Sequence, residues 1–396
     1  MLRRFHLFGA VLIMAACGCT ATKPRPAGVD NLLRRAVETR RVPGVVAMVA
    51  TAEGVAYEGA FGFNKDAIFA IASMTKPVTS VAVMQLVEAG KVNPDDPAAR
   101  YLPELATVQV LEAGKLRAPA TPVTVRQLLT HTSGFGYEFL NRELSEYVAQ
   151  GKAPSVFTGS VESLKAPLVS DPGKSWEYGI STDWLGRLVE KVSGQSLEAY
   201  LRRNLFEPLG MRDTYFDVPP EKEARRVAVH QRAGNGSLAE QPRAPAKPAA
   251  FLSGGGGLSS TAPDYLKFAQ ALMAGGRLGQ ARILRPQSVA TMGRNQIGAL
   301  ECCPFSSLMP QLIKDGTELP GGLDKFGLGF AVNTRPLGRG RGANTLSWAG
   351  VFNTFFWIDR DRRVCAVLMS QMAPFLDDGP RALLEDFDRA VYDWLR

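Results

Sequence analysis

The chain has 396 residues, of which 45% are hydrophobic and 21% are charged, and its formal net charge at pH 7 is +8. This length suffices for a large buried core, in one big domain or in two interleaved domains. The basic residues are scattered and lack interleaved stacking aromatics, which argues against a nucleic-acid groove. A mildly basic surface that faces anionic envelope components explains the charge more simply.

The N-terminus predicts a targeting segment. Arg3 and Arg4 form a positive start, and a short apolar stretch over residues 7–16 leads to Cys17. This pattern resembles a bacterial lipoprotein signal, in which the cysteine becomes the lipidated first residue of the mature protein. We therefore expect residues 1–16 to be a signal peptide and Cys17 to be the lipidation site.

The neighbours of Cys17 bear on location. Met14 replaces the leucine that is usual three residues before the cysteine, which leaves cleavage by an ordinary signal peptidase open. Gly18 is not the aspartate that retains lipoproteins in the inner membrane. We expect a lipid anchor on the periplasmic face of the outer membrane, with residues 17–27 as a tether.

Four further cysteines give no catalytic or metal-binding signal. Cys302 and Cys303 are adjacent and lack the spacing of a zinc site, so we expect no metal and no cofactor. In an oxidising compartment one of them can form a disulfide. The sequence leaves the connectivity among Cys19, Cys302, Cys303 and Cys365 open.

The first part of the folded chain predicts a helix over residues 30–41 and a β-hairpin with strands over 45–51 and 54–63. A run that is mostly apolar from residue 78 to residue 87 then predicts a buried helix. Gly90 ends this helix, because glycine tolerates the left-handed backbone angles of a helix C-terminus.

The buried helix carries the main chemical signal. Pro77 fits only in a first turn, so the helix begins near Ser73. Lys76 follows Ser73 by three residues and therefore shares its helix face. This is the Ser-x-x-Lys arrangement of acyl-transferring enzymes, in which a neighbouring base activates the serine. Alone, the same residues also fit a helix cap and a first-turn surface lysine.

The chemistry requires Lys76 to accept a proton. A lysine can be this base if burial and nearby positive charge lower its pKa toward the working pH. The helix N-terminus adds backbone N–H groups that can stabilise an oxyanion.

The middle of the chain predicts helices. Periodicity is helical from about residue 124 to residue 216, without a convincing strand. Residues 217–252 are rich in Pro, Arg, Lys and Ala and predict a long surface loop. The glycine run over 254–257 fits either a flexible linker or tight backbone packing between domains.

The last part returns to strands, over residues 329–333, 346–348, 352–358 and 364–370, and closes with a helix over 381–395. Strands at both ends with helices between them predict an α/β (α+β) fold. We expect one antiparallel sheet that is flanked by helices and built from both ends of the chain, with a mainly helical insert.

This pattern predicts the domain boundaries. The α/β domain comprises residues 28–92 and 256–396, and the inserted, mainly helical domain comprises residues 93–255.

Two further segments can complete a site with Ser73. Tyr178 precedes a helix, and its phenol could relay protons between Ser73 and a leaving group. Trp348 lies on a strand beside small residues, which often mark the close approach of a ligand. The N–H of Val351, paired with that of Ser73, would make an oxyanion hole. Taken singly, Tyr178 and Trp348 also fit ordinary packed aromatic residues.

Three signatures in this order resemble those of the family VIII carboxylesterases. They are Ser73-Met74-Thr75-Lys76, Tyr178-Gly179-Ile180 and Trp348-Ala349-Gly350. These proteins are serine esterases with the class C β-lactamase and D-alanyl-D-alanine-peptidase fold. The resemblance covers roughly residues 28–396 and includes the stretch from Gln127 to Gly134.

The resemblance implies that Ser73 is acylated and that Lys76 and Tyr178 share general acid–base duty. It implies a β-lactamase/DD-peptidase-like fold and a small-molecule ester as substrate. It also implies substrate-binding roles for Trp348, Gly350, Phe135 and Tyr137.

Departures from the β-lactamase pattern favour uncharged esters, and we expect a hydrolase of short- to medium-chain carboxylic esters. Ile180 stands where class C enzymes have an asparagine that holds the lactam side-chain amide. Trp348-Ala349-Gly350 replaces Lys-Thr-Gly, whose lysine attracts the β-lactam carboxylate. Gly179 stands where the esterases often have serine, which leaves the tyrosine intact.

Other functions remain open. The same site could hydrolyse β-lactams or D-alanyl peptides or transfer an acyl group to an acceptor other than water, and an envelope lipoprotein could use the fold only for binding. A Ser-His-Asp triad would need His131 or His230, and His131 fits better as a structural residue in a turn. The oligomeric state is not readable from the residues.

Overall fold

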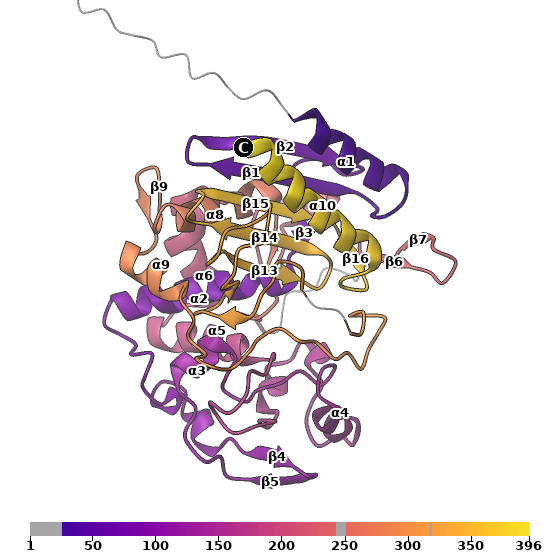
Figure 1. Cartoon of the computed structure of the whole chain (residues 1–396). Coiled ribbons are helices and arrows are strands. Elements are labelled where there is room, and N and C mark those ends of the chain that lie inside the picture. The colour runs from indigo at the N-terminus through magenta and orange to yellow at the C-terminus, as the bar shows by residue number, and fades with distance from the viewer. Residues whose placement is uncertain (1–25, 243–250, 317–318) are drawn as a thin grey trace, which may run out of the picture.

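The computed structural model describes residues 26–242, 251–316 and 319–396 (Figure 1). A seven-stranded sheet, antiparallel throughout, forms one half of the molecule. In spatial order its strands are β11 (Lys325–Phe326), β12 (Ala331–Val332), β13 (Leu346–Gly350), β14 (Thr354–Asp359), β15 (Val364–Met369), β1 (Val45–Thr51) and β2 (Gly54–Phe61).

The central strands β14, β15 and β13 are buried at every position, because helices cover both faces of the sheet. Consecutive residues of β14 show this directly. Phe356 packs against Tyr265 of α8 (Ala262–Met273), whereas Trp357 packs against Phe387 of α10 (Asp378–Leu395). Neighbouring strand residues point to opposite faces, so α8 and α10 lie on opposite sides of the sheet. Helix α1 (Ala27–Glu38) lies beside α10 (Figure 1).

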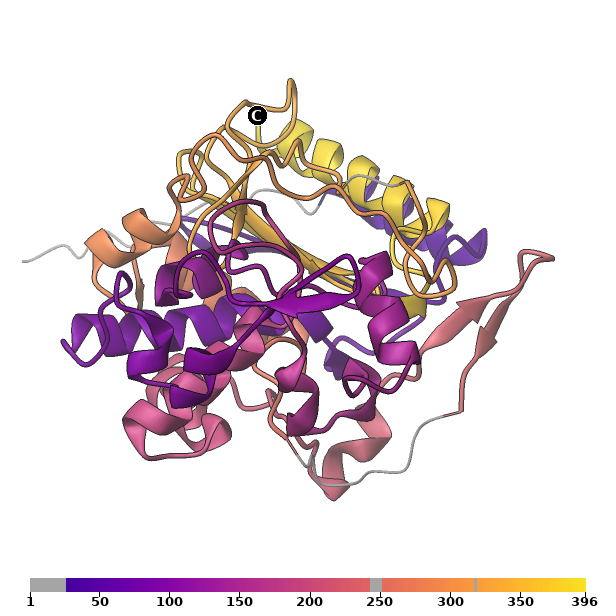
Figure 2. The same ribbon diagram turned by 90° about the horizontal axis from the view of Figure 1, so that it is seen from below.

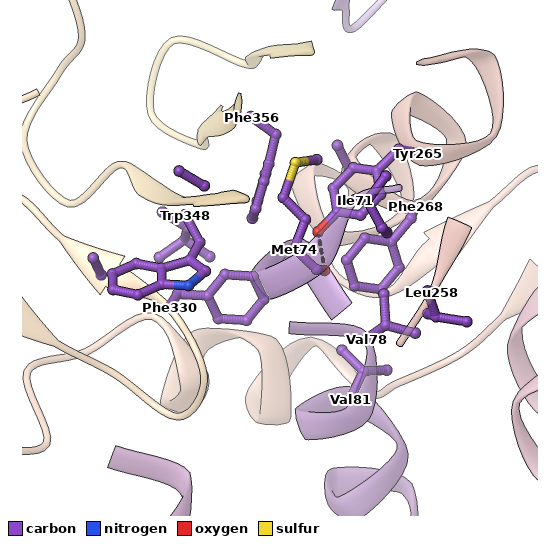
Figure 3. Close-up of a cluster of buried hydrophobic side chains, with 14 of the residues drawn as sticks. Ile71, Met74, Val78, Val81, Leu258, Tyr265, Phe268, Phe330, Trp348 and Phe356 are labelled. Atoms are coloured by element: carbon purple, nitrogen blue, oxygen red, sulfur yellow. Dashed lines mark hydrogen bonds between the residues drawn. The ribbon is translucent and has the colours of Figure 1, made fainter. Parts of the chain in front are cut away.

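Helix α2 (Thr75–Glu88) runs through the interior between the sheet and the helical half (Figure 1). Eleven of its fourteen residues are buried, including Lys76 and Pro77 in its first turn. A 3₁₀ turn, Ala72–Met74, precedes it, so Ser73 lies in this turn rather than at the first α-helical position. The Tyr265 hydroxyl donates a hydrogen bond to the Met74 carbonyl (2.8 Å) and ties the turn to α8 (Figure 3).

The helical half surrounds the other side of α2, and α5 (Ser181–Ser193) makes the most extensive contact with it. Thr124 and Gln127 form a capping box at the start of α3. The α-helices of this part are α3 (Val125–Thr130), α4 (Arg142–Ala149), α5 (Ser181–Ser193), α6 (Leu197–Leu201) and α7 (Glu207–Leu209). Short 3₁₀ turns cover Ala98–Arg100, Pro103–Thr107, Val156–Thr158 and Val161–Lys165, a π turn covers Arg202–Phe206, and a hairpin joins β4 (Val110–Glu112) to β5 (Lys115–Arg117).

The predicted loop over 217–252 is only partly a loop. It contains a 3₁₀ turn, Pro220–Arg225, and a hairpin of β6 (His230–Arg232) and β7 (Leu238–Glu240) that projects from the body (Figure 2). Strand β6 pairs in parallel with β16 (Met372–Ala373). The sequence pattern misses this strand because its partner lies far along the chain.

The remaining elements are short. Strand β3 (Phe69–Ala70) pairs with β8 (Ser259–Ser260), and β9 (Arg277–Leu278) pairs with β10 (Ala281–Arg282). Helix α9 is Pro286–Met292. The predicted fold class, an antiparallel sheet flanked by helices with a mainly helical insert, is confirmed by this arrangement.

The expected signal peptide over 1–16 and its lipidated Cys17 lie outside the described residues, as does nearly all of the tether over 17–27. Within the described ranges, no helix is both long and apolar enough to cross a membrane. Cys302 and Cys303 form a disulfide with each other, which settles the connectivity that the sequence left open for this pair. Cys365 is a free, buried thiol.

The glycine run over 254–257 packs tightly against α5 rather than acting as a linker. A Cβ at Gly254 would lie 2.7 Å from the Thr182 carbonyl oxygen and 3.0 Å from Cα of Gly186. Both neighbours are backbone atoms that cannot rotate away. The run therefore joins the segment before α8 to α5 by close backbone contact.

We predict that Gly254→Ala lowers the free energy of unfolding by about 1–3 kcal/mol, because the added methyl group overpacks this contact. Gly234→Ala is the matched control, since a Cβ at Gly234 meets no atom within 4 Å. Chemical denaturation measures both variants. Equal stability of Gly254→Ala and the wild type would contradict the proposed tight packing.

Candidate active site

Ser73 lies on the wall of a cavity of about 350 Å³ between the sheet and the helical half. The preceding residue, Ala72, has a φ of 42°, a left-handed angle that is uncommon for a residue other than glycine. Such backbone angles are often found at functional sites, where the surroundings enforce them. Here the angle marks the entry to the 3₁₀ turn that presents Ser73.

Lys76 is 1% exposed, and hydrogen bonds occupy all three of its N–H donors. Its Nζ donates to Ser73 Oγ (3.2 Å), to Tyr137 Oη (3.0 Å) and to the Gly255 carbonyl oxygen (2.7 Å). A buried ammonium is stable only when its donors are bonded in this way. The geometry holds the nitrogen beside the serine hydroxyl, as the Ser-x-x-Lys spacing predicts.

The pKa of Lys76 is not lowered in this site. Burial by itself favours the neutral amine, but Tyr137, Tyr178 and Asp183 outweigh it and raise the pKa of Lys76 above its usual value. No positive side chain takes part in this balance among the described neighbours that shift Lys76. Lys76 is therefore an ammonium in the resting site.

Tyr178 lies directly beside Lys76, whose Nζ is 4.7 Å from the centre of the phenol ring. The indole N–H of Trp348 donates a hydrogen bond to Tyr178 Oη (3.2 Å). The ring also packs against Trp176 and Phe305, with centroids 5.9 Å and 5.6 Å away. These contacts fix the phenol at the meeting point of Lys76 and the sheet.

Backbone contacts also hold Tyr178. The N–H of Tyr137 donates to the Tyr178 carbonyl oxygen (3.1 Å). A Cβ at Gly179 would clash with the Phe135 carbonyl oxygen and with the backbone of Gly136. Glycine at this position therefore matches a close approach of the two backbone segments.

His131 packs under the tyrosine, with ring centroids 5.0 Å apart. Burial and the Lys76 charge lower its pKa well below the usual value, so the imidazole is neutral. Its backbone ends α3 with a φ of 58°, and its carbonyl oxygen accepts a hydrogen bond from the N–H of Glu177 (2.8 Å). These contacts agree with a structural role for His131.

Val351 lines the cavity directly after β13, on the side of the Ser73 turn. Gly350, the last residue of β13, makes this proximity possible: a Cβ there would clash with the Ile71 carbonyl oxygen. The end of β13 thus lies against the start of the serine turn. This is the arrangement that a backbone oxyanion hole of Ser73 and Val351 needs.

Two of the residues predicted to bind substrate do not line the cavity. Phe135 is fully buried and packs on Trp184, and it is absent from the cavity lining among the residues that the structure describes. Gly350 is likewise absent from that lining and serves the contact of β13 with Ile71. Trp348 and Tyr137 do line the cavity.

The lining is mostly apolar and rich in aromatic rings. Within the described part of the chain it contains neither lysine nor arginine, and Asp183 is its one carboxylate. Sequence reasoning missed most of these residues, because they come from turns and irregular segments without periodicity. The nine aromatic residues are Tyr137, Phe139, Phe157, Tyr178, Phe251, Phe305, Trp348, Phe352 and Phe375.

Comparison with known proteins identifies the family of this chain. The Beta-lactamase family model matches residues 29–390. The chain is 32% identical to monacolin J acid methylbutanoyltransferase of Aspergillus terreus, over 92% of this chain and 95% of that protein. It is 29% identical to lovastatin esterase of Penicillium rubens, over 92% and 98% of the two chains.

Solved structures give the same result. Unliganded simvastatin synthase from Aspergillus terreus superimposes with a TM-score of 0.82 at 31% identity, covering 92% of this chain and 97% of that one. EstCE1, described as a hydrolase with promiscuous acyltransferase activity, shares the fold with a TM-score of 0.73 at 24% identity, covering 92% and 97%. The chain therefore belongs to the Beta-lactamase family, among its serine hydrolases and acyltransferases.

Proposed function

We propose that this protein cleaves uncharged carboxylic esters of short to medium chain length through an acyl-enzyme on Ser73. The observation that carries the proposal is the buried Lys76 nitrogen, 3.2 Å from Ser73 Oγ inside an aromatic-lined cavity. Ser73 Oγ attacks the ester carbonyl, and the Lys76–Tyr178 pair takes its proton. The same pair protonates the leaving alcohol as the ester bond breaks. Water then releases the acid by the reverse proton transfers.

Because Lys76 rests as an ammonium, it must first give up a proton before it can act as the base. The lone pair so formed would take the place of one of the three N–H donors. One of these three positions faces Ser73 Oγ. The N–H groups of Ser73 and Val351 would then stabilise the oxyanion. Trp348 would keep the Tyr178 hydroxyl oxygen in place through its indole N–H.

The lining supports uncharged apolar substrates. Its aromatic rings favour apolar acyl and alcohol groups. A carboxylate-bearing β-lactam would find neither lysine nor arginine among the described lining residues. Hydrolysis of β-lactams or D-alanyl peptides therefore has less support than ester cleavage.

Acyl transfer to an alcohol is the second candidate, since a relative of 32% identity is named a methylbutanoyltransferase. An apolar cavity open to a second organic substrate would favour transfer over hydrolysis. The acyl-enzyme on Ser73 is common to both reactions. They differ only in whether water or an alcohol accepts the acyl group.

We also propose that the protein acts at the periplasmic face of the outer membrane, anchored by lipid at Cys17. The support is the positive start at Arg3 and Arg4, the apolar stretch before Cys17, and Gly18 after it.

Lys76→Ala and Tyr178→Phe should each lower kcat for a p-nitrophenyl acyl ester by roughly two decades or more, with the fold retained, because each removes a proton carrier. Steady-state kinetics with circular dichroism as the folding check measures this. Ser73→Ala should abolish turnover and fluorophosphonate labelling. Labelling of neither wild type nor variant would instead favour a non-catalytic binding protein.

The rate at which a fluorophosphonate labels Ser73 should rise with pH between about pH 6 and pH 9. The sign follows from the raised pKa of Lys76, since the neutral base is scarce at neutral pH and grows as the pH increases. Labelling of wild type at fixed probe concentration gives the profile. A rate that is already flat above about pH 6 would show that Lys76 is deprotonated at rest.

Adding a bulky apolar alcohol to a p-nitrophenyl ester reaction should divert part of the acyl group to a new ester if transfer competes with water. Chromatography of the products gives the ratio of new ester to free acid. Free acid alone, at alcohol concentrations that compete with p-nitrophenyl ester binding, would identify the enzyme as a hydrolase only.

A further inference from the structure

Asp183 is a buried carboxylate to which the proposed reaction assigns no role. It lies in the first turn of α5 and is 5% exposed. Tyr178, just before this helix, and Asp183 therefore reach the site from one segment. A buried carboxylate costs free energy unless donors satisfy it, so its partners indicate what it does.

Both partners of Asp183 lie on the segment that leads into the glycine run. Its Oδ1 accepts hydrogen bonds from the Ser253 hydroxyl and from the N–H of Gly255 (3.0 Å). The carbonyl oxygen of the same Gly255 accepts the shortest of the three bonds from Lys76 Nζ (2.7 Å). One residue thus connects the carboxylate to the ammonium through its two backbone polar groups.

The position of Gly255 depends on close packing. A Cβ on this residue would lie 2.5 Å from Asp183 Oδ2 and 3.0 Å from its Cγ. On the other side, the Gly254 carbonyl oxygen accepts a hydrogen bond from the Thr79 hydroxyl of α2 (2.8 Å). The backbone at Gly255 is therefore held between α5 and α2. Its contact with α2 is made by Thr79, which lies one helical turn after Lys76.

We propose that Asp183 is a positioning residue that holds the Gly255 carbonyl against the Lys76 ammonium and so keeps this nitrogen directed at Ser73. The inference rests on the proposed acyl-enzyme function of Ser73. Asp183 lies on the wall of the same cavity as Ser73 and acts on Lys76 through Gly255. Its charge also favours the buried ammonium, because Asp183 raises the pKa of Lys76.

Four titratable groups face Lys76 in this site. Tyr137 and Tyr178 lie on the segments packed against Lys76. The Lys76 charge lowers the pKa of His131. Burial raises the pKa of Tyr137 and lowers that of His131, so both are neutral at neutral pH. Burial raises the pKa of Asp183, whereas the Lys76 charge and the hydrogen bonds from Ser253 and Gly255 lower it. Asp183 is the carboxylate of this group, so its removal should make Lys76 easier to deprotonate.

Asp183→Asn tests the proposal, because asparagine keeps the size of the side chain and loses the charge. We expect kcat for a p-nitrophenyl ester to fall roughly 10-fold to 100-fold while KM changes little, because a displaced base slows chemistry more than binding. The pH range over which kcat rises (the pH limb) should move to lower pH by roughly half a unit or more, since the lost charge no longer favours the ammonium.

Gly255→Ala separates position from charge. The added Cβ pushes on Asp183 Oδ2 and leaves both charges in the site. We expect it to lower kcat without moving the pH limb. It also serves as the test if Asp183→Asn does not fold, and wild-type kcat in folded Gly255→Ala would then overturn the proposal.

Asp264→Asn is the matched control. Asp264 is 4% exposed, lies in the first turn of α8 and accepts a hydrogen bond from the backbone N–H of Asp213 (2.6 Å), but it is absent from the cavity lining among the described residues. The Asp264→Asn substitution should lower the free energy of unfolding and leave kcat and the pH limb unchanged. The proposal is overturned if Asp183→Asn keeps wild-type kcat and pH limb, or if Asp264→Asn alters both equally.

The rate of Ser73 labelling by a fluorophosphonate provides a second readout that does not require an ester substrate. If wild type labels at Ser73 and Asp183→Asn labels equally fast at every pH, only the role of Asp183 fails. If wild type does not label at Ser73 at all, the proposed function fails first.

Discussion

The site depends on one buried ammonium. Lys76 has to be kept in an apolar interior, and the structure does so by bonding each of its N–H groups to a different segment. Ser73 belongs to its own turn, Tyr137 to the helical half, and Gly255 to the segment that leads into α8. Because a buried charge without partners is very unfavourable, these segments are held in one arrangement around the lysine.

The two halves of the molecule contribute different chemistry to this centre. The helical half supplies Tyr137 and Tyr178, and the sheet supplies Trp348 and the backbone of Val351. Close backbone contacts replace side chains where the halves meet, and Gly350 is one example. The cavity is therefore a property of the interface, and neither half would form it alone. Relatives named as esterase and as acyltransferase align with this chain over most of their length.

The sequence alone predicted the sheet, the buried helix and the proximity of Ser73 and Lys76, because periodicity and helix geometry are local. It could not predict the ionisation of Lys76, which depends on partners from distant segments. Asp183 escaped notice because an aspartate in a first helical turn looks like an ordinary helix start. Phe135 was expected at the substrate and is instead core, since order along the chain does not show which way a side chain points.

The central claim is that the Ser73 hydroxyl becomes covalently acylated with the help of the adjacent Lys76. Intact-protein mass spectrometry of a rapidly quenched reaction with an ester, followed by peptide mapping, measures this directly. The account predicts a mass increase of one acyl group on the peptide that contains Ser73. Turnover of the ester without an adduct at any time, or with the adduct on another residue, would contradict it.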